Sequence, residues 1–223
     1  MFVTRRQFIE CGAAAGAVTA VSAIGASSAI ASALEDASYP TTRSAARVAV
    51  DPVIDTRLLA RARASFARHR SRLRHVDLVG IADFSKPSAL PRFYLLDTYS
   101  GRVTSHLVSH GRGSDPEHSG WLRRFSNSMG SNASSNGAYV TGDFYYGRYG
   151  RSMRVSGLDH SNSNAHARAI VVHSAWYAEP NQVAQHGRLG RSEGCFAMSY
   201  SSLQETLTRL GPGRFLYADK IEA

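Results

Sequence analysis

The chain is organised around residues 170–198, IVVHSAWYAEPNQVAQHGRLGRSEGCFAM. This segment opens with an apolar run that ends at His173, and it closes with Gly194 and Cys195. A thiol becomes a strong nucleophile when a neighbouring imidazole takes its proton, and such a pairing can lower the thiol pKa. Glycine before the cysteine lets the backbone approach a substrate carbonyl closely. The pattern therefore predicts a candidate active site, against the alternative of a buried structural cysteine.

Length and charge limit the classes of protein that fit. The 223 residues are typical of one domain of ordinary size. The formal net charge is +9, from 26 Lys and Arg against 17 Asp and Glu, and the lysines are only Lys86 and Lys220. This balance favours anionic partners such as nucleic acid, anionic lipid or cell-envelope polymers, but net charge alone does not choose among them.

The N-terminal residues indicate the compartment. Residues 4–9, TRRQFI, form a twin-arginine signature, and residues 12–33 carry no charge and are rich in Ala, Gly and Ser. We predict a twin-arginine export leader at 1–33, with an uncleaved membrane anchor as the alternative. The Ala, Ser, Thr and Pro of residues 34–54 predict a linker. Export by this route places the mature protein in the periplasm, cell envelope or medium, which disfavours nucleic acid as its partner.

The cysteine count makes the thiol informative. The two cysteines are Cys11 and Cys195, and Cys11 lies within the predicted leader. Once the leader is removed, an exported protein with one thiol has no internal disulfide. An odd cysteine in this setting indicates a free reactive thiol.

The remaining residues, 55–223, predict one mainly β domain with an N-terminal helix and one late helix. Asp55 is a candidate N-cap for the first helix, which spans 55–75, and the second helix ends before Gly211. Between them, β-branched and aromatic runs alternate with turn residues, which is typical of antiparallel strands. The expected strands are 76–83, 92–97, 102–110, 137–142, 144–149, 152–155, 169–173 and 214–218; the late helix is 200–210, and 111–136 is expected to be a long surface loop.

The first predicted helix has a strongly basic face. Its arginines are Arg57, Arg61, Arg63, Arg68, Arg70, Arg72 and Arg74. Such a face could contact a membrane surface or an anionic envelope polymer. The preferred interpretation is a solvated face on a helix that packs through its apolar side.

The central segment resembles the L,D-transpeptidase catalytic domain, a cysteine-dependent murein cross-linking family. The family motif is a His followed, after a variable spacer, by Ser/Thr-His-Gly-Cys, and His173, Ser192, Gly194 and Cys195 match it. Residues 110–115, HGRGSD, and 126–147, SNSMGSNASSNGAYVTGDFYYG, also resemble one branch of this family. The resemblance runs from about residue 55 to the C-terminus and implies an antiparallel β-sandwich or barrel. Glu193 departs from the motif, because the family has its second His there.

The resemblance also implies a mechanism. Cys195 would be the nucleophile, His173 its base, and the backbone carbonyl of Ser174 would orient the imidazole. The thiol would attack a peptidoglycan tetrapeptide stem after the L-centre of diaminopimelate, release D-Ala and leave a thioester. An amine on a second stem, or water, would then take the acyl group. No metal or nucleotide cofactor is implied, and the partners are peptidoglycan stem peptides.

Three residues next to the nucleophile are candidates for substrate binding. The amides of Gly194 and Cys195 are our candidates for oxyanion donors. Ser192 belongs to the matching motif, and Arg191 lies close enough in sequence to bind a stem carboxylate, although a solvated arginine is the alternative.

Histidines and aromatic residues elsewhere give weaker signals. His186 lies in the polar loop between the two halves of the motif, and a solvated loop histidine is the expectation there. His106 and His110 alternate along one strand, which predicts packing, although His110 also resembles a family position that could line the cleft. Trp176 and Tyr177 could form a wall for substrate, with packing as the alternative.

Three other functions remain as alternatives. A sortase-like transpeptidase would use His173, Cys195 and Arg214, but the Thr-Leu-x-Thr-Cys strand of sortases is missing. A zinc site at Cys195, His173 and His186 would lack close pairs of ligands. A cell-wall binding module without turnover is the non-enzymatic alternative, and Glu193 is the residue that motivates it.

Overall fold

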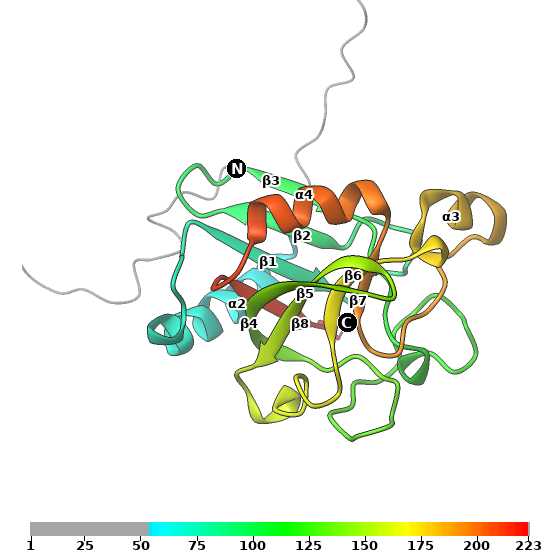
Figure 1. Cartoon of the computed structure of the whole chain (residues 1–223), viewed down its shortest axis with the longest axis horizontal. Coiled ribbons are helices and arrows are strands. Elements are labelled where there is room, and N and C mark those ends of the chain that lie inside the picture. The colour runs from blue at the N-terminus through cyan, green and yellow to red at the C-terminus, as the bar shows by residue number, and fades with distance from the viewer. Residues whose placement is uncertain (1–53, 223) are drawn as a thin grey trace, which may run out of the picture. The chain divides into compact units, whose positions relative to one another are not determined.

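The structure is a computed structural model that describes residues 54–222 (Figure 1). The predicted leader at 1–33 and all but the last residue of the predicted linker at 34–54 lie outside the described residues. Between residues 54 and 222, no helix has the length and apolar character needed to span a membrane. The α-helices of this part are α2 (Thr56–His69), α3 (Pro180–His186) and α4 (Tyr200–Leu210).

Eight strands form one mixed sheet in the order β3-β2-β1-β8-β4-β5-β6-β7. The pairs β1–β8 and β6–β7 are parallel, and the other five are antiparallel, so the prediction of a mainly β, largely antiparallel domain is confirmed. The strands are β1 (Leu78–Asp83), β2 (Phe93–Asp97), β3 (Val103–His106), β4 (Gly137–Gly147), β5 (Gly150–Gly157), β6 (Val171–Ser174), β7 (Phe196–Met198) and β8 (Phe215–Asp219).

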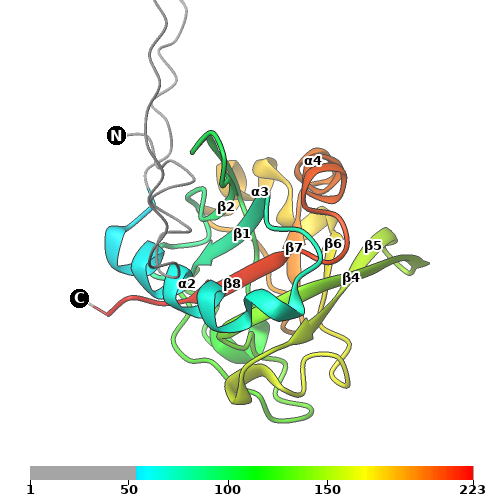
Figure 2. The ribbon, with the colours of Figure 1, turned by 90° about the vertical axis from the view of Figure 1, so that its left-hand side faces the viewer.

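Helix α2 forms where its cap and apolar spacing predict. The Asp55 side chain accepts hydrogen bonds from the amides of Arg57, at 2.8 Å, and Leu58, at 3.4 Å, which satisfies two amides of the first turn. Leu58 and Phe66 are buried on one face of the helix, and the Phe66 ring meets the Phe215 ring of β8 edge-on at 5.4 Å. The helix therefore covers one face of the sheet at β1 and β8 (Figure 2).

Alternation along β1 separates two hydrophobic clusters. Val79 and Ile81 belong to the cluster that includes α2, whereas Leu78 and Ala82 belong to the cluster that includes α4. The two helices therefore lie on opposite sides of β1 and β8 (Figure 2). The α4 cluster also contains residues of β4, β5, β6 and β7, so the two halves of the sheet share one core, as in the expected sandwich.

Four parts of the sequence differ from the prediction. The strand expected at 102–110 ends at His106, so His106 and His110 do not lie on one strand. Helix α3 was not predicted; it is only seven residues long, begins at Pro180 and ends at His186, and Gly187 follows it with a left-handed φ of 67°. Strand β7 was also missed, because three residues are too few to show an alternating pattern. The two strands predicted at 137–142 and 144–149 are one strand, β4, with a register shift between Thr141 and Phe144.

The segment 111–136 is irregular, as expected, but it is not confined to the surface. Apart from a 3₁₀ turn at Arg112–Ser114, it contains no helix or strand. Its Ser114, Asp115, Leu122 and Ser134 are at most 1% exposed. The polar side chains can be buried because they bond the backbone; the Ser134 amide, for example, donates to Ser114 Oγ at 2.9 Å.

We predict that Leu207→Ala destabilises the fold by about 2–5 kcal/mol, since Leu207 is 1% exposed in the shared core and its loss leaves a cavity. Thr208→Ala, on the exposed side of the same helix, should change the free energy of unfolding by less than about 0.5 kcal/mol. Urea unfolding followed by circular dichroism measures both changes. Equal values for the two variants would contradict the packing of α4.

Candidate active site

His173 lies in β6 with its ring fixed by the backbone. The side chain is 2% exposed, and Nδ1 lies 2.9 Å from the carbonyl oxygen of Ser174. A carbonyl can only accept, so Nδ1 carries the proton and Nε2 keeps its lone pair. The ring of Tyr149 stacks on the imidazole with centroids 4.3 Å apart and an interplanar angle of 27°. The imidazole is therefore held in the tautomer that a base requires, by the residue expected to orient it.

Cys195 comes directly before β7, which pairs in parallel with β6. The register places His173 opposite Ala197, two residues beyond the cysteine. The Cys195 thiol donates to the carbonyl of Ala169 at 3.6 Å and accepts a hydrogen bond from the Val171 amide. His173 and Cys195 line one pocket of about 410 Å³, a volume typical of small-molecule sites.

Both groups are neutral at neutral pH. Burial raises the pKa of the Cys195 thiol to about 11, and the charge of Glu193 adds to this rise, whereas the Val171 amide and Arg168 oppose it. Burial lowers the pKa of His173. The lowering of the thiol pKa expected from a neighbouring imidazole is therefore not found, and the two groups rest as a thiol and a neutral imidazole that line the same pocket.

The residues before the thiol form a tight hydrogen-bonded turn. Ser192 Oγ accepts from the Gly194 amide at 3.1 Å and donates to the Cys195 carbonyl at 2.8 Å. Gly194 has φ of 112°, and a Cβ there would lie 2.6 Å from the Ala133 carbonyl oxygen. Only glycine fits this position. The Gly194 amide is engaged with Ser192 here, and its service as an oxyanion donor stays a prediction.

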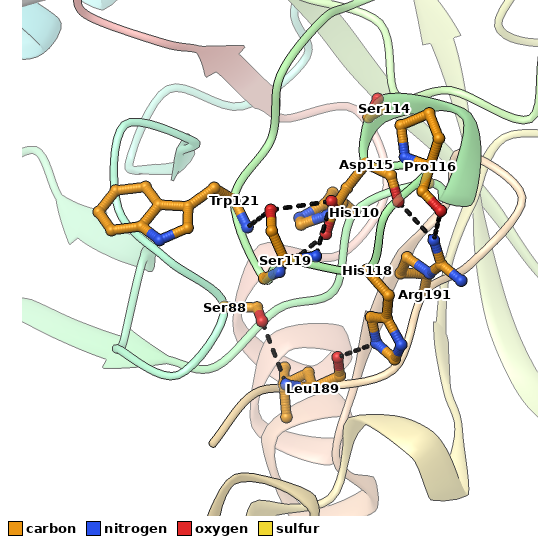
Figure 3. A network of polar contacts seen from close by, with 12 residues as sticks. Ser88, His110, Ser114, Asp115, Pro116, His118, Ser119, Trp121, Leu189 and Arg191 are labelled. Atoms are coloured by element: carbon orange, nitrogen blue, oxygen red, sulfur yellow. Dashed lines mark hydrogen bonds and ion pairs between the residues drawn. The ribbon is translucent and has the colours of Figure 1, made fainter. Parts of the chain in front are cut away.

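Arg191 also lines the pocket and is anchored to the segment that follows β3. Its Nη1 donates to the backbone carbonyls of Asp115 and Pro116, the latter at 3.0 Å (Figure 3). The predicted contact with a stem carboxylate would use the other donors of the guanidinium, which has five.

A buried polar network supports this wall of the pocket. Arg92 Nη2 donates to His110 Nδ1 at 2.8 Å, so His110 carries its proton on Nε2, which faces Asp115 Oδ2 at 3.3 Å. Asp115 also accepts from the amides of Ser119 and Gly120, each at 2.8 Å (Figure 3). His110 and Asp115 are 1% and 0% exposed, and neither is among the residues that line the pocket, so the idea that His110 lines the cleft is wrong.

Burial, together with the nearby Arg92 charge, lowers the pKa of His110 to about 3. Burial alone would raise the pKa of Asp115, but the amides of Ser119 and Gly120 and the other donors together lower it. The pair is therefore a neutral imidazole that donates to a carboxylate. It holds the backbone next to Ser192, whose amide donates to the His110 carbonyl at 2.9 Å.

Of the other candidate residues, some line the pocket and some lie outside it. Tyr177 lines the pocket, whereas Trp176 is exposed outside it. His186 ends α3 on the surface and His106 faces Glu205 at 3.7 Å. Neither histidine lines the pocket within the described part of the chain.

The sortase arrangement is not assembled. Arg214 donates through Nε and Nη2 to Asp77, at 2.9 Å in each case, and it does not line the pocket in residues 54–222. For the zinc alternative, residues 54–222 contain no group of three His, Cys, Asp or Glu side chains placed to hold a metal ion.

The sequence did not single out several residues of the site, among them Tyr145, Arg148 and Val171. Ala169 accepts from the thiol and has φ of 54°, a left-handed conformation that is uncommon outside glycine. Tyr149 stacks on the base, and Arg112 and Arg168 also line the pocket. No local pattern distinguishes them, because each reaches the site through a contact between segments distant in sequence.

The chain matches one protein family over most of its length. The sequence profile described as "L,D-transpeptidase catalytic domain" matches residues 51–218. No curated protein matches the chain.

Several solved structures of L,D-transpeptidases resemble the chain weakly. An L,D-transpeptidase from Mycobacterium smegmatis is 15% identical with a TM-score of 0.40, over 64% of this chain and 58% of the other. L,D-transpeptidase 1 from Mycobacterium tuberculosis is 16% identical with a TM-score of 0.36, over 63% and 60%. The L,D-transpeptidase from Xylanimonas cellulosilytica is 16% identical with a TM-score of 0.38, over 66% and 62%. The chain thus spans about three fifths of the length of these proteins.

The raised thiol pKa predicts the pH dependence of alkylation. Because the thiolate is the reactive form and its pKa is about 11, the rate of Cys195 alkylation by iodoacetamide should rise about tenfold per pH unit from pH 7 to 10. Glu193→Gln should lower the thiol pKa and speed alkylation severalfold at pH 8, whereas Glu117→Gln, an exposed residue outside the pocket, should not. Peptide mapping separates Cys195 from Cys11. A rate that levels off below pH 8 would contradict the neutral thiol.

Proposed function

Because the chain belongs to the L,D-transpeptidase catalytic domain family, we propose that it forms a thioester between Cys195 and a peptidoglycan tetrapeptide stem and transfers the acyl group to an amine or to water. One observation carries the proposal. His173, with Nδ1 bound to the Ser174 carbonyl and Nε2 carrying a lone pair, shares a pocket with the free thiol of Cys195. Acyl transfer through a thioester requires a base and a nucleophile in one site, and here β6 carries the proposed base while the proposed nucleophile directly precedes β7.

In the first step, His173 Nε2 takes the thiol proton as Cys195 Sγ attacks the carbonyl carbon of the L-centre of diaminopimelate. A neutral imidazole and a neutral thiol suit this order, because the proton moves during attack. The carbon–sulfur bond forms, the bond to D-Ala breaks, and His173 returns the proton to the departing amine. The thioester remains on Cys195.

In the second step, an amine of another stem attacks the thioester, and His173 takes the proton from that amine. The new amide is a cross-link between two diaminopimelate residues, and Cys195 leaves as a thiolate that recovers the proton. Water in place of the amine gives hydrolysis, which would make the protein an L,D-carboxypeptidase. The Cys195 amide, with that of Gly194 if it leaves Ser192, is the proposed oxyanion donor.

The substrate side of the pocket is assigned to polar residues near the thiol. Arg191 would bind a stem carboxylate through the donors that do not hold the backbone, and Ser192 would keep the turn in place. Export by the predicted twin-arginine leader would place this chemistry in the periplasm or cell envelope. The exposed arginines of α2 would then be available for contact with anionic polymers or a membrane surface.

A binding module without turnover is the second candidate. The raised pKa of Cys195 favours it, because the thiol stays protonated near neutral pH and a binding module requires no activated thiol. Glu193 stands where the family motif has His, and its carboxylate also raises the pKa of the Cys195 thiol.

We predict that the wild-type protein, incubated with purified tetrapeptide stems, gains the mass of the acyl-tripeptide on Cys195 and releases D-Ala. Cys195→Ala should keep the fold, since the change removes a single atom of sulfur, and should show neither adduct nor product. Intact-mass spectrometry and chromatography of the muropeptides measure both. Binding to sacculi with no adduct and no product would instead support the binding module.

We also predict that His173→Gln lowers kcat by about 10²–10⁴-fold, because it removes the general base. Ser174→Ala should stay within a few-fold of wild type, since the group that orients His173 is the Ser174 backbone carbonyl, which the variant keeps. Steady-state release of D-Ala gives both values. A loss in Ser174→Ala as large as that in His173→Gln would show that the side chain acts, and not the carbonyl.

A further inference from the structure

The charges that line the pocket are unequal. Four arginines line it and one carboxylate faces them: Arg112, Arg148, Arg168, Arg191 and Glu193. A pocket that only had to bind an anionic stem would have no reason to include a carboxylate beside the thiol, because that charge disfavours the thiolate.

Three of these arginines already have contacts. Arg168 donates to the carbonyls of Ser126, at 2.7 Å, and Ala133. Arg191 donates to backbone carbonyls in the same way, and Arg148 lies over the Tyr149 ring at 5.7 Å from its centroid. Their positions are thus set by contacts within the protein.

The fourth, Arg112, pairs with Glu193 through Nη2 and Oε1 at 3.0 Å. The two side chains are 56% and 69% exposed, and exposed ion pairs contribute little to stability. The backbone brings them together: Gly111 bridges Ser192 in parallel, and the Arg112 amide donates to the Ser192 carbonyl at 2.7 Å. The paired backbone therefore holds one cationic and one anionic side chain next to each other. Each of them could leave its partner and bind an opposite charge on a ligand.

We propose that Arg112 and Glu193 bind the zwitterionic head of an α-amino acid, with its carboxylate on the Arg112 guanidinium and its ammonium on the Glu193 carboxylate. The guanidinium offers a fork of donors to a carboxylate, and Glu193 offers two acceptor oxygens to an ammonium. This assignment rests on the proposed function: the ligand is the second centre of diaminopimelate in the stem. That centre carries both an ammonium and a carboxylate. The pair would thus select stems whose third residue ends in a zwitterion.

Electrostatics near the thiol agree with this assignment. The charge of Glu193 raises the pKa of Cys195 in the empty pocket. A ligand ammonium on Glu193 would offset that charge, so the thiol would ionise more readily when the correct substrate is bound. Glu193, which stands where the family motif has His, would then make a charge contact with the substrate.

The test measures binding without requiring turnover. Calorimetric titration of the full chain with meso-diaminopimelate should give a Kd at least about tenfold lower than titration with pimelate, which lacks the ammonium groups, or with 1,5-diaminopentane, which lacks the carboxylates. Arg112→Gln and Glu193→Gln should each lose about tenfold in affinity for meso-diaminopimelate. Arg72→Gln and Glu117→Gln, exposed residues outside the pocket, are the charge-matched controls and should bind as wild type.

The double variant Arg112→Glu with Glu193→Arg exchanges the two charges and should recover most of the affinity lost in the single variants. Equal affinity for meso-diaminopimelate and pimelate, or unchanged binding in both single variants, would overturn the proposal. Stems with lysine in place of diaminopimelate separate this result from the proposed function. Lysine keeps the side-chain ammonium and lacks the carboxylate that Arg112 would bind. If stems acylate Cys195 but lysine raises KM no more in wild type than in Arg112→Gln, the zwitterion site fails and the enzyme stands. Selective binding of meso-diaminopimelate without any acylation supports the site and removes the enzyme.

Discussion

The site depends on the parallel pairing of β6 with β7. Val172 faces Phe196 and His173 faces Ala197 across this pair, so His173 and the residues that follow Cys195 are fixed in adjacent strands. A parallel pair needs a long connection, and residues 175–195 supply it with a short helix and a polar turn. Phe196 anchors the pair in the shared core, where its ring meets that of Tyr139 edge-on at 5.5 Å. A shift of register in this pair would move His173 relative to Cys195.

Support for the turn before Cys195 comes from a second contact between distant segments. The backbone near Gly111 joins the backbone at Ser192, and the buried Arg92, His110 and Asp115 hold that segment in place. Their hydrogen bonds are satisfied internally, which is the condition for burying charged groups without a large cost. The same network that looks like a cluster of titratable groups therefore serves the geometry of the turn before Cys195.

Electrostatics distinguish this pocket from one with a preformed ion pair. The thiol and the imidazole are both neutral because each loses hydration in the folded protein. Glu193 adds to the rise in the thiol pKa, and its ion-pair partner Arg112 is exposed. In the proposed reaction, the charges that arrive with a ligand would change the electrostatic balance around Cys195.

The sequence by itself determined the parts that depend on neighbours in the chain. The Asp55 cap, the bounds of α4 at 200–210 and most of the strands follow from local pattern, and His173 and Cys195 follow from their motif. Only the tertiary structure decided which strands are parallel, that His110 is buried beside Asp115, and that Arg112 faces Glu193. The raised thiol pKa also belongs to this second group. The physical reason is that burial and charge contacts are sums over residues far apart in sequence, whereas a cap or a periodic apolar face is set within a few residues.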